Sequence, residues 1–144
     1  MVTQNRRYMY NQPTKRFPKR LAEFLFPNID PKQIKDAHLN ISGSLIVEFA
    51  DGSRKVRKLP GNLDPITLAR LERRLVFGKL ILQGYTLKKV EGGYKCITGE
   101  GVEYYMQDET CECKDFSYNL GEREPCKHLL FKDAFLELLE IFNS

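Results

Sequence analysis

The sequence predicts an α+β protein with two antiparallel sheets, and three observations favour this fold class. Apolar and polar residues alternate in two separate stretches, over residues 37–59 and 85–107, as they do in half-buried strands. Glycine-containing dipeptides divide each stretch, as expected where tight turns join neighbouring strands. Apolar residues recur at helical spacing over residues 62–82 and 127–142, which predicts two longer helices.

The N-terminal half begins with a basic segment. Residues 1–20 contain six cations and no acidic residue, and since the whole chain carries +4, the other 124 residues sum to −2. We interpret residues 1–16, which are polar and interrupted by Pro13, as a flexible basic arm. A short helix is predicted over residues 18–26, where Pro27 ends it.

The first sheet follows this helix. Asp30-Pro31 predicts a capped turn that runs through Ala37. Three strands are then predicted near residues 37–41, 44–50 and 54–59. The third strand is heavily charged, which is typical of a strand at the edge of a sheet.

The central helix, predicted over residues 62–82, has Asp64 as its cap and Pro65 in its first turn. Gly78 is a candidate interruption. Strands are predicted next over residues 85–90, 94–98 and 102–107, and a final helix over 127–142. We therefore divide the chain into an arm (1–16), an N-terminal α+β region with the linking helix (17–84) and a C-terminal domain (85–144).

Composition limits the class of protein. The chain has 144 residues, of which 42% are hydrophobic and 29% charged, and its mean hydropathy is −0.44, as expected of a soluble protein. No apolar run approaches the roughly 20 residues of a membrane helix, and the N-terminus lacks the apolar segment of a secretory signal. We expect an intracellular protein, cytoplasmic or nuclear, in which four cysteines favour metal binding or free thiols over disulfides.

Three of these cysteines and one histidine form a metal-binding pattern. Cys111 and Cys113 lie two apart on an extended segment, so their side chains point to the same side. Cys126 and His128 follow where Pro125 ends a loop and the last helix begins. Three thiolates and one imidazole make a closed tetrahedral set for one structural Zn²⁺, with no position left for a catalytic water.

Other interpretations of these residues exist. The four cysteines are also compatible with buried thiols or with disulfides. Cys96 is an alternative ligand, although its place in the strand over residues 94–98 favours a small core residue. His38 has no cysteine or acidic cluster near it in the sequence, which is typical of an ordinary histidine at a strand edge.

The pattern Cys-x-Cys, a variable gap, then Cys-x-His resembles the SWIM zinc finger. The resemblance covers roughly residues 85–142 and extends to Cys113-Lys114-Asp115-Phe116, to Cys126-Lys127-His128-Leu129-Leu130, and to the aromatic residues Tyr94, Tyr104 and Tyr105. It implies a zinc-bound ββα unit with Cys111, Cys113, Cys126 and His128 as ligands. It also implies an association with DNA or other proteins, since such fingers accompany transposases, chromatin remodelling ATPases, ubiquitin ligases and recombination accessory proteins.

Nucleic acid is the first candidate partner. The arm interleaves cations with aromatic rings, for contact with phosphates and unpaired bases. The alternative is a solvated tail and charged helix faces that only meet water. The candidate contacts are Arg6, Arg7, Lys15, Arg16, Lys19, Arg20, Arg54, Arg57, Arg70, Arg73, Arg74, Lys114 and Lys127.

A protein partner or a homodimer is the alternative. The last helix has a narrow polar stripe that includes Asp133, Glu137 and Glu140, and an apolar arc wider than a one-sided surface helix needs. Burial between the sheet and the N-terminal half is the competing explanation. We expect no enzyme, because no phosphate-binding glycine-lysine loop occurs and the acids near the finger lack a neighbouring histidine base; no small-molecule substrate is indicated.

Overall fold

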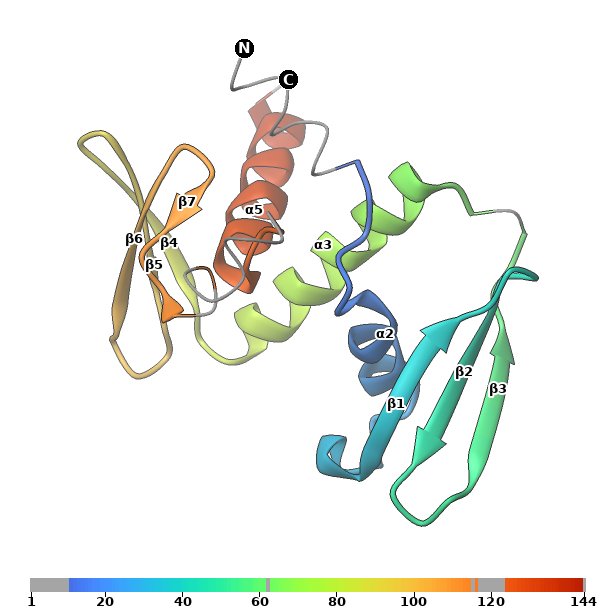
Figure 1. Ribbon diagram of the computed structural model, residues 1–144. Helices are drawn as coiled ribbons and strands as arrows, with labels where there is room; N and C mark the ends of the chain where they lie inside the picture. The colour runs from blue at the N-terminus through green and yellow to red at the C-terminus, as the bar shows by residue number, and fades with distance from the viewer. Residues whose placement is uncertain (1–10, 62, 115, 117–123, 144) are drawn as a thin grey trace.

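The computed structural model describes residues 11–61, 63–114, 116 and 124–143 and confirms the α+β fold class (Figure 1). The described chain forms two lobes, each built on one antiparallel sheet. Helix α3 (Pro65–Leu82) runs between the lobes. Across these described ranges, no helix is both long and apolar enough to cross a membrane.

The N-terminal lobe packs a short helix against a three-stranded sheet of order β1-β2-β3. Leu45 and Val47 of the central strand are fully buried and face Phe17 of the helix. All five residues of β3 are exposed, so the charged third strand is an edge strand, as predicted. The elements are α2 (Phe17–Leu25), the 3₁₀ helix η1 (Pro31–Gln33), β1 (Ile34–Leu39), β2 (Ser44–Phe49) and β3 (Arg54–Lys58).

The turn predicted from Asp30 through Ala37 is wrong in its second half. Asp30 does cap η1 by accepting a hydrogen bond from the backbone N–H of Lys32 at 3.0 Å. The chain then enters β1 at Ile34, which is 5% exposed and pairs with Phe49. Pairing with β2 and burial of Ile34 therefore end the helical turn earlier than the local sequence indicated.

Helix α3 contributes to both hydrophobic cores. Its start is confirmed, since the Asp64 carboxylate accepts a hydrogen bond from the backbone N–H of Thr67 at 2.7 Å, and it continues without a break through Gly78. Leu71 and Leu75 pack against the N-terminal core, whereas Val76 and Leu80 lie in the C-terminal core. These pairs lie on different sides of the helix, so α3 joins the two lobes through side-chain packing.

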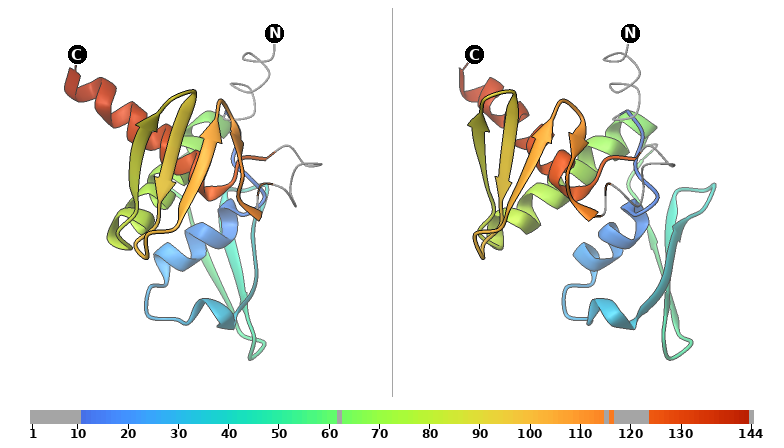
Figure 2. Two further views of the ribbon diagram at one scale, coloured as in Figure 1. Left: turned by 90° about the vertical axis from the view of Figure 1, so that its left-hand side faces the viewer. Right: turned by 60° about the vertical axis from the view of Figure 1, so that its left-hand side comes forward.

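The C-terminal lobe is a four-stranded sheet of order β4-β5-β6-β7, and helix α5 crosses one of its faces (Figure 2). Phe131 of α5 is fully buried and stacks on Phe77 of α3 with 5.4 Å between ring centroids. The fourth strand was not predicted, because it is only two residues long. The elements are β4 (Thr86–Val90), β5 (Gly93–Ile97), β6 (Glu103–Gln107), β7 (Thr110–Cys111) and α5 (Lys127–Asn143).

The segment that precedes α2 is attached to α3 through Glu72. The backbone N–H and the hydroxyl of Thr14 donate to the Glu72 carboxylate at 2.8 and 2.5 Å, and Arg20 donates to it at 2.6 Å. Glu72 is 1% exposed, and these donors compensate the loss of water around its charge. The last residues of the predicted arm are therefore held against the body of the protein, while residues 1–10 lie outside the described residues.

Candidate metal centre

Four side chains from two segments meet inside the C-terminal lobe. Cys111 is the last residue of β7 and Cys113 follows it, while Cys126 and His128 lie at the start of α5. Pairing of Cys111 with Met106 of β6 places its thiol on the face of the sheet that forms the C-terminal core. All four residues are buried, with 3 to 5% of their surface exposed, and their ligand atoms all lie within 4.8 Å of one another.

The geometry fits a single tetrahedral metal ion. Nδ1 of His128 lies 3.8 Å from Sγ of Cys111 and 3.9 Å from Sγ of Cys126. Zinc ligated at about 2.3 Å from sulfur and about 2.0 Å from nitrogen separates such atoms by about 3.5 Å. These two nitrogen–sulfur distances therefore exceed the tetrahedral value by only a few tenths of an ångström, and the predicted ligand set could hold one metal ion.

Hydrogen bonds couple the three thiols of the cluster to one another. Hydrogen bonds from the Cys111 and Cys126 thiols lower the pKa of Cys113, and the backbone N–H of Phe116 also donates to its sulfur at 3.3 Å. Donation to Cys113 and to Cys126, with burial, raises the pKa of Cys111. The sulfur of Cys113 thus accepts hydrogen bonds from the thiols of Cys111 and Cys126. A bound metal cation would replace the protons of those thiols.

Cys96 is a neighbour of the cluster and not one of its ligands. It is fully buried in β5 beside Met106 in the same core, and burial raises its pKa to about 12. This confirms the interpretation of Cys96 as a core residue. No disulfide joins any of the four cysteines in the structure.

Aromatic rings surround the imidazole of His128. Tyr104 stacks on it with 4.5 Å between ring centroids, and Tyr85 lies beside it at 6.3 Å. Lys127 in turn places its ammonium 6.0 Å from the Tyr85 ring. The imidazole is therefore enclosed by rings that fix its plane.

Comparisons with protein-family models, with curated proteins and with solved structures found no match to this chain.

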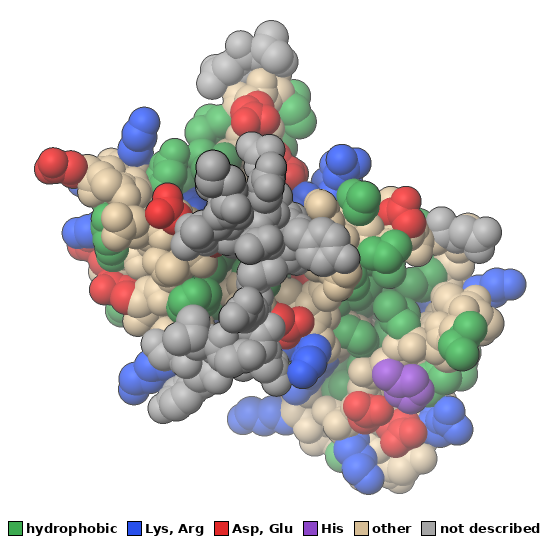
Figure 3. All heavy atoms as spheres, turned by 45° about the horizontal axis from the view of Figure 1, so that its top comes forward, with side chains coloured by type: hydrophobic (Ala, Val, Ile, Leu, Met, Phe, Trp, Pro, Cys, Tyr) green, Lys and Arg blue, Asp and Glu red, His purple; other side chains and the backbone are tan. Residues whose placement is uncertain are grey.

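The predicted nucleic-acid contacts occupy several different surfaces. Lys15, Arg16 and Lys19 are exposed near the start of α2, and Arg54 and Arg57 are exposed on the edge strand β3. On the face in Figure 3, Lys and Arg side chains are interspersed with acidic ones and do not form a single basic patch. Arg6 and Arg7 lie outside the described residues. Arg70, Arg74 and Lys114 are also exposed, Lys127 is half-buried, and Arg20 and Arg73 pair with Glu72 and Glu137.

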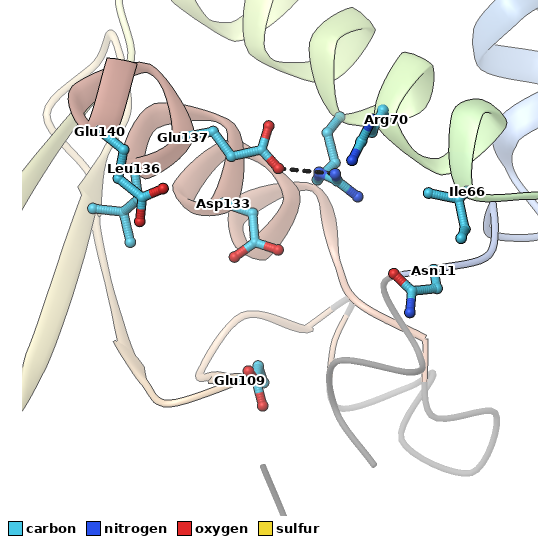
Figure 4. Close-up of a pocket in the computed structure, with 9 residues that line it drawn as sticks. Asn11, Ile66, Arg70, Glu109, Asp133, Leu136, Glu137 and Glu140 are labelled. Carbon is cyan, nitrogen blue, oxygen red and sulfur yellow. Dashed lines mark hydrogen bonds and ion pairs between the residues drawn. The ribbon is translucent and has the colours of Figure 1, made fainter. Parts of the chain in front are cut away.

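Two of these arginines line a cleft of about 500 Å³ between α3 and α5 (Figure 4). Arg73 donates to Glu137 at 2.9 Å, and burial raises the pKa of Asp133 above its ordinary value. Because Arg73 is 7% exposed and bonded to a carboxylate, it is poorly placed to contact a phosphate. The cleft is lined by Asn11, Ile66, Arg70, Arg73, Glu109, Asp133, Leu136, Glu137 and Glu140.

One feature beside the metal centre was missed by the sequence analysis. The backbone N–H of Lys15 donates to Oε2 of Glu124 at 2.8 Å, and Glu124 lies two residues before the ligand Cys126. The described end of the basic arm thus contacts Glu124, just before Cys126 and His128 at the start of α5. Lys15 and Glu124 are 109 positions apart, so no local sequence pattern predicts their contact. The only signal in the sequence is the acidic side chain of Glu124 itself, directly before Pro125.

Proposed function

We propose that this protein is a small zinc-dependent factor that binds nucleic acid, with one structural Zn²⁺ in a SWIM-type finger and no catalytic role. The observation that carries the proposal is the buried cluster of Cys111, Cys113, Cys126 and His128. Three sulfurs and one nitrogen match the softness and coordination number that zinc prefers in closed structural sites. The spacing Cys-x-Cys and Cys-x-His adds the resemblance to the SWIM finger.

The proposed role of the metal is to stabilise the fold of the C-terminal lobe. The four ligands connect the end of the sheet to the start of α5, and three of them lie in the same core as Phe131 and Met106. When bound, zinc supplies binding energy that becomes folding energy for this lobe. The finger is then a rigid support for the surface next to it.

The proposed interface lies where the basic arm meets the finger. The Lys15–Glu124 hydrogen bond brings the cations of the arm beside the loop before Cys126. Lys15, Arg16 and Lys19 are exposed in or just after the arm, and Lys114, which follows the ligand Cys113, is exposed as well. These four exposed cations would contact phosphates, and DNA is the partner that the resemblance to the SWIM finger favours.

The test is fluorescence anisotropy with labelled single-stranded and double-stranded DNA over a salt series. Each phosphate contact adds about −0.9 to the slope of log affinity against log salt for duplex DNA. The variant Lys15→Glu, Arg16→Glu, Lys19→Glu should therefore flatten the slope by about two to three and weaken binding at low salt. The matched control is Arg54→Glu, Lys55→Glu, Lys58→Glu, which reverses three exposed cations on β3 far from the finger.

The expected result is a large loss in the arm variant and a small one in the β3 variant. Equal losses would mean that only the net charge matters, and the interface beside the finger would be refuted. DNA binding that is weaker than micromolar and does not depend on salt concentration would refute the proposed nucleic-acid function.

A further inference from the structure

Strand β3 is an open edge with a dense positive charge. It is the last strand of the N-terminal sheet, and among the described residues no strand pairs with its other side. Figure 1 shows it on the outer side of its lobe. Four of its five residues are cations, and all five are exposed. Within the described part of the chain, none of these cations forms an ion pair with a carboxylate.

The backbone of β3 presents hydrogen-bonding groups at alternate residues. At the ends of the ladder with β2, Phe49 donates to Ser53 at 2.9 Å and Leu59 donates to Gly43 at 3.1 Å. Residues bonded to the neighbouring strand alternate along an antiparallel ladder, so the odd-numbered residues of β3 bond to β2. The even-numbered residues therefore direct their N–H and C=O groups to the open edge. These residues are Arg54, Val56 and Lys58.

Two cations of β3 lie on the core face of the sheet. Lys55 lies opposite the buried Val47 of β2. Arg57 in turn lies opposite the buried Leu45. The Lys55 ammonium and the Arg57 guanidinium lie 5.2 and 5.4 Å from the ring centroid of Phe26. This contact orients both side chains without neutralising their charges, so both remain available to an anionic partner.

The outer face of β3 presents one apolar side chain between two cations. Val56 is 62% exposed and lies opposite Ile46 of β2. Arg54 and Lys58 lie two residues away on either side of it, and therefore on the same face. Glu48 lies opposite Arg54 in the register, although no ion pair joins the two. A strand added at this edge would thus meet two cations, a valine and two more cations in order.

This order determines which strand fits the edge. Directly opposed residues of an antiparallel pair share one face, so the complementary segment reads acid, acid, apolar, acid, acid. A second copy of β3 would place cations opposite cations, which destabilises strand pairing. The sequence itself contains no complementary segment, because Asp108 and Glu109 are its only adjacent acidic residues. Charges on an edge strand also exclude strands that cannot neutralise them, so the edge selects an acidic segment of another protein.

We propose that the edge of β3 binds an extended segment of another protein with the pattern acid, acid, apolar, acid, acid. The segment adds as a fourth, antiparallel strand to the N-terminal sheet. Its central residue exchanges backbone hydrogen bonds with Val56 and covers the Val56 side chain. Its four carboxylates meet the cations of β3, which are Arg54, Lys55, Arg57 and Lys58. This function goes beyond the proposed binding of nucleic acid and uses none of the cations in that interface.

The test measures binding of the fluorescein-labelled peptide Thr-Glu-Glu-Val-Glu-Glu-Thr to the full-length, zinc-loaded protein by fluorescence anisotropy. Two further peptides carry a methyl group on one backbone nitrogen and keep the same side chains and charge. Methylation at the valine removes the N–H that faces Val56, whereas methylation at the next glutamate removes an N–H that faces away from β3. We expect the first to bind about fivefold more weakly and the second to bind like the parent peptide.

Variants of β3 test the same contacts from the protein side. Val56→Pro removes one outward N–H without changing a charge or a hydrogen bond to β2, and should weaken binding about fivefold. The β3 variant described above should weaken binding about tenfold or more and bind a peptide with lysine in place of glutamate. The arm variant is its matched control, because it reverses the same number of cations and should bind the acidic peptide like the wild type. If Val56→Pro lowers the melting temperature, the methylated peptides decide.

Amide hydrogen exchange measured by NMR locates the bound segment. Peptide binding should slow exchange at residues 54, 56 and 58, whose N–H groups point to the open edge. Exchange at residues 55 and 57 should change little, because their N–H groups already bond to β2. Binding through charge alone would not produce this alternation.

Several results would overturn the proposal. These are the absence of peptide binding, equal affinities of the two methylated peptides, equal losses in the arm and β3 variants, and exchange protection outside β3. Displacement of the peptide by duplex DNA would assign the cations of β3 to nucleic acid instead. A dimer that dissociates in the β3 variant, measured by sedimentation equilibrium, would assign the edge to a second copy. Because DNA binding is expected to depend on the arm and peptide binding on β3, the two proposals fail independently.

Discussion

The phenol ring of Tyr104 lies face to face with the imidazole of His128, with 4.5 Å between centroids and 28° between planes. His128 presents Nδ1 to the sulfurs of Cys111 and Cys126, which leaves Nε2 on the other side of the ring. Nε2 is buried, and no acceptor for it occurs within the described part of the chain. A metal-bound histidine is commonly oriented by a hydrogen bond from its second ring nitrogen. In His128, packing against the Tyr104 ring takes over this role.

This packing predicts a role for Tyr104 in metal affinity. Tyr104→Ala removes the ring that fixes the imidazole and should weaken zinc binding by about tenfold, at the lower end of effects seen for groups that orient ligands. Tyr104→Phe keeps the ring and should bind zinc like the wild type. Competition with a chromogenic chelator measures the affinity. Tyr105→Ala is the matched control, because its strand neighbours place Tyr105 on the opposite face of the sheet; an equal loss there would refute the role.

A second prediction concerns the anchor of the arm. Glu72→Gln removes the charge that Arg20 and Thr14 bind while it keeps the size of the side chain. Because Glu72 is 1% exposed, the change should reduce the free energy of unfolding by about 2 kcal/mol, which lowers the melting temperature by about 4–8 °C. Amide exchange at residues 14 and 15 should also accelerate.

The control for the anchor is Glu23→Gln. Glu23 pairs with Lys79 at 3.5 Å, and that lysine is 61% exposed, so the change should have little effect on stability. Similar melting temperatures for the two variants would show that the buried carboxylate does not stabilise the protein.

Asp133 predicts a defined dependence of stability on pH. Burial raises its pKa above the ordinary value of 3.8, so the folded protein holds this proton more tightly than the unfolded chain. Stability contributed by Asp133 is therefore lost as pH rises from about 3.8 through the raised pKa. Asp133→Asn stays neutral, so its stability relative to the wild type should increase over that interval and then remain constant. Urea unfolding of both proteins from pH 4 to 8 measures this difference, and a difference that shrinks with pH would contradict the account.

Removal of metal should affect the lobes unequally. The ligands Cys111, Cys113 and Cys126 belong to the C-terminal core, whereas the N-terminal core around Phe17 and Leu45 contains none of them. Treatment with a strong chelator should therefore expose the amides of β4 to β7 to exchange while β1 to β3 stay protected. Readdition of zinc should restore protection. Uniform loss in both lobes would instead show that they fold as one unit through α3.

Local patterns were sufficient for most of the fold. The Asp64 cap, the alternation in β2 and the Cys-x-Cys and Cys-x-His spacings depend on neighbouring residues, and the structure contains the elements and the cluster that they predict. The β1 start at Ile34 was misplaced because pairing with Phe49 outweighs the local turn signal. Strand β7 was missed because two residues are too few for a periodic pattern.

Long-range polar contacts could not be predicted from the sequence. No local pattern distinguishes Glu72 in the sequence, yet it is the buried acceptor for Thr14 and Arg20. Arg73 is one of the predicted nucleic-acid contacts, although it is buried and bonded to Glu137. Which charges lie inside depends on how α3 packs between the two lobes, and helical periodicity alone does not determine that packing.

The most direct test is to measure the number of zinc ions bound per chain in purified protein by elemental mass spectrometry. The wild type and Cys96→Ser should each carry one zinc, because Cys96 is buried beside the cluster without belonging to it. Cys126→Ser should carry close to none and should lose the folded C-terminal lobe. A full zinc in Cys126→Ser, or its loss in Cys96→Ser, would contradict the ligand set on which the proposed function rests.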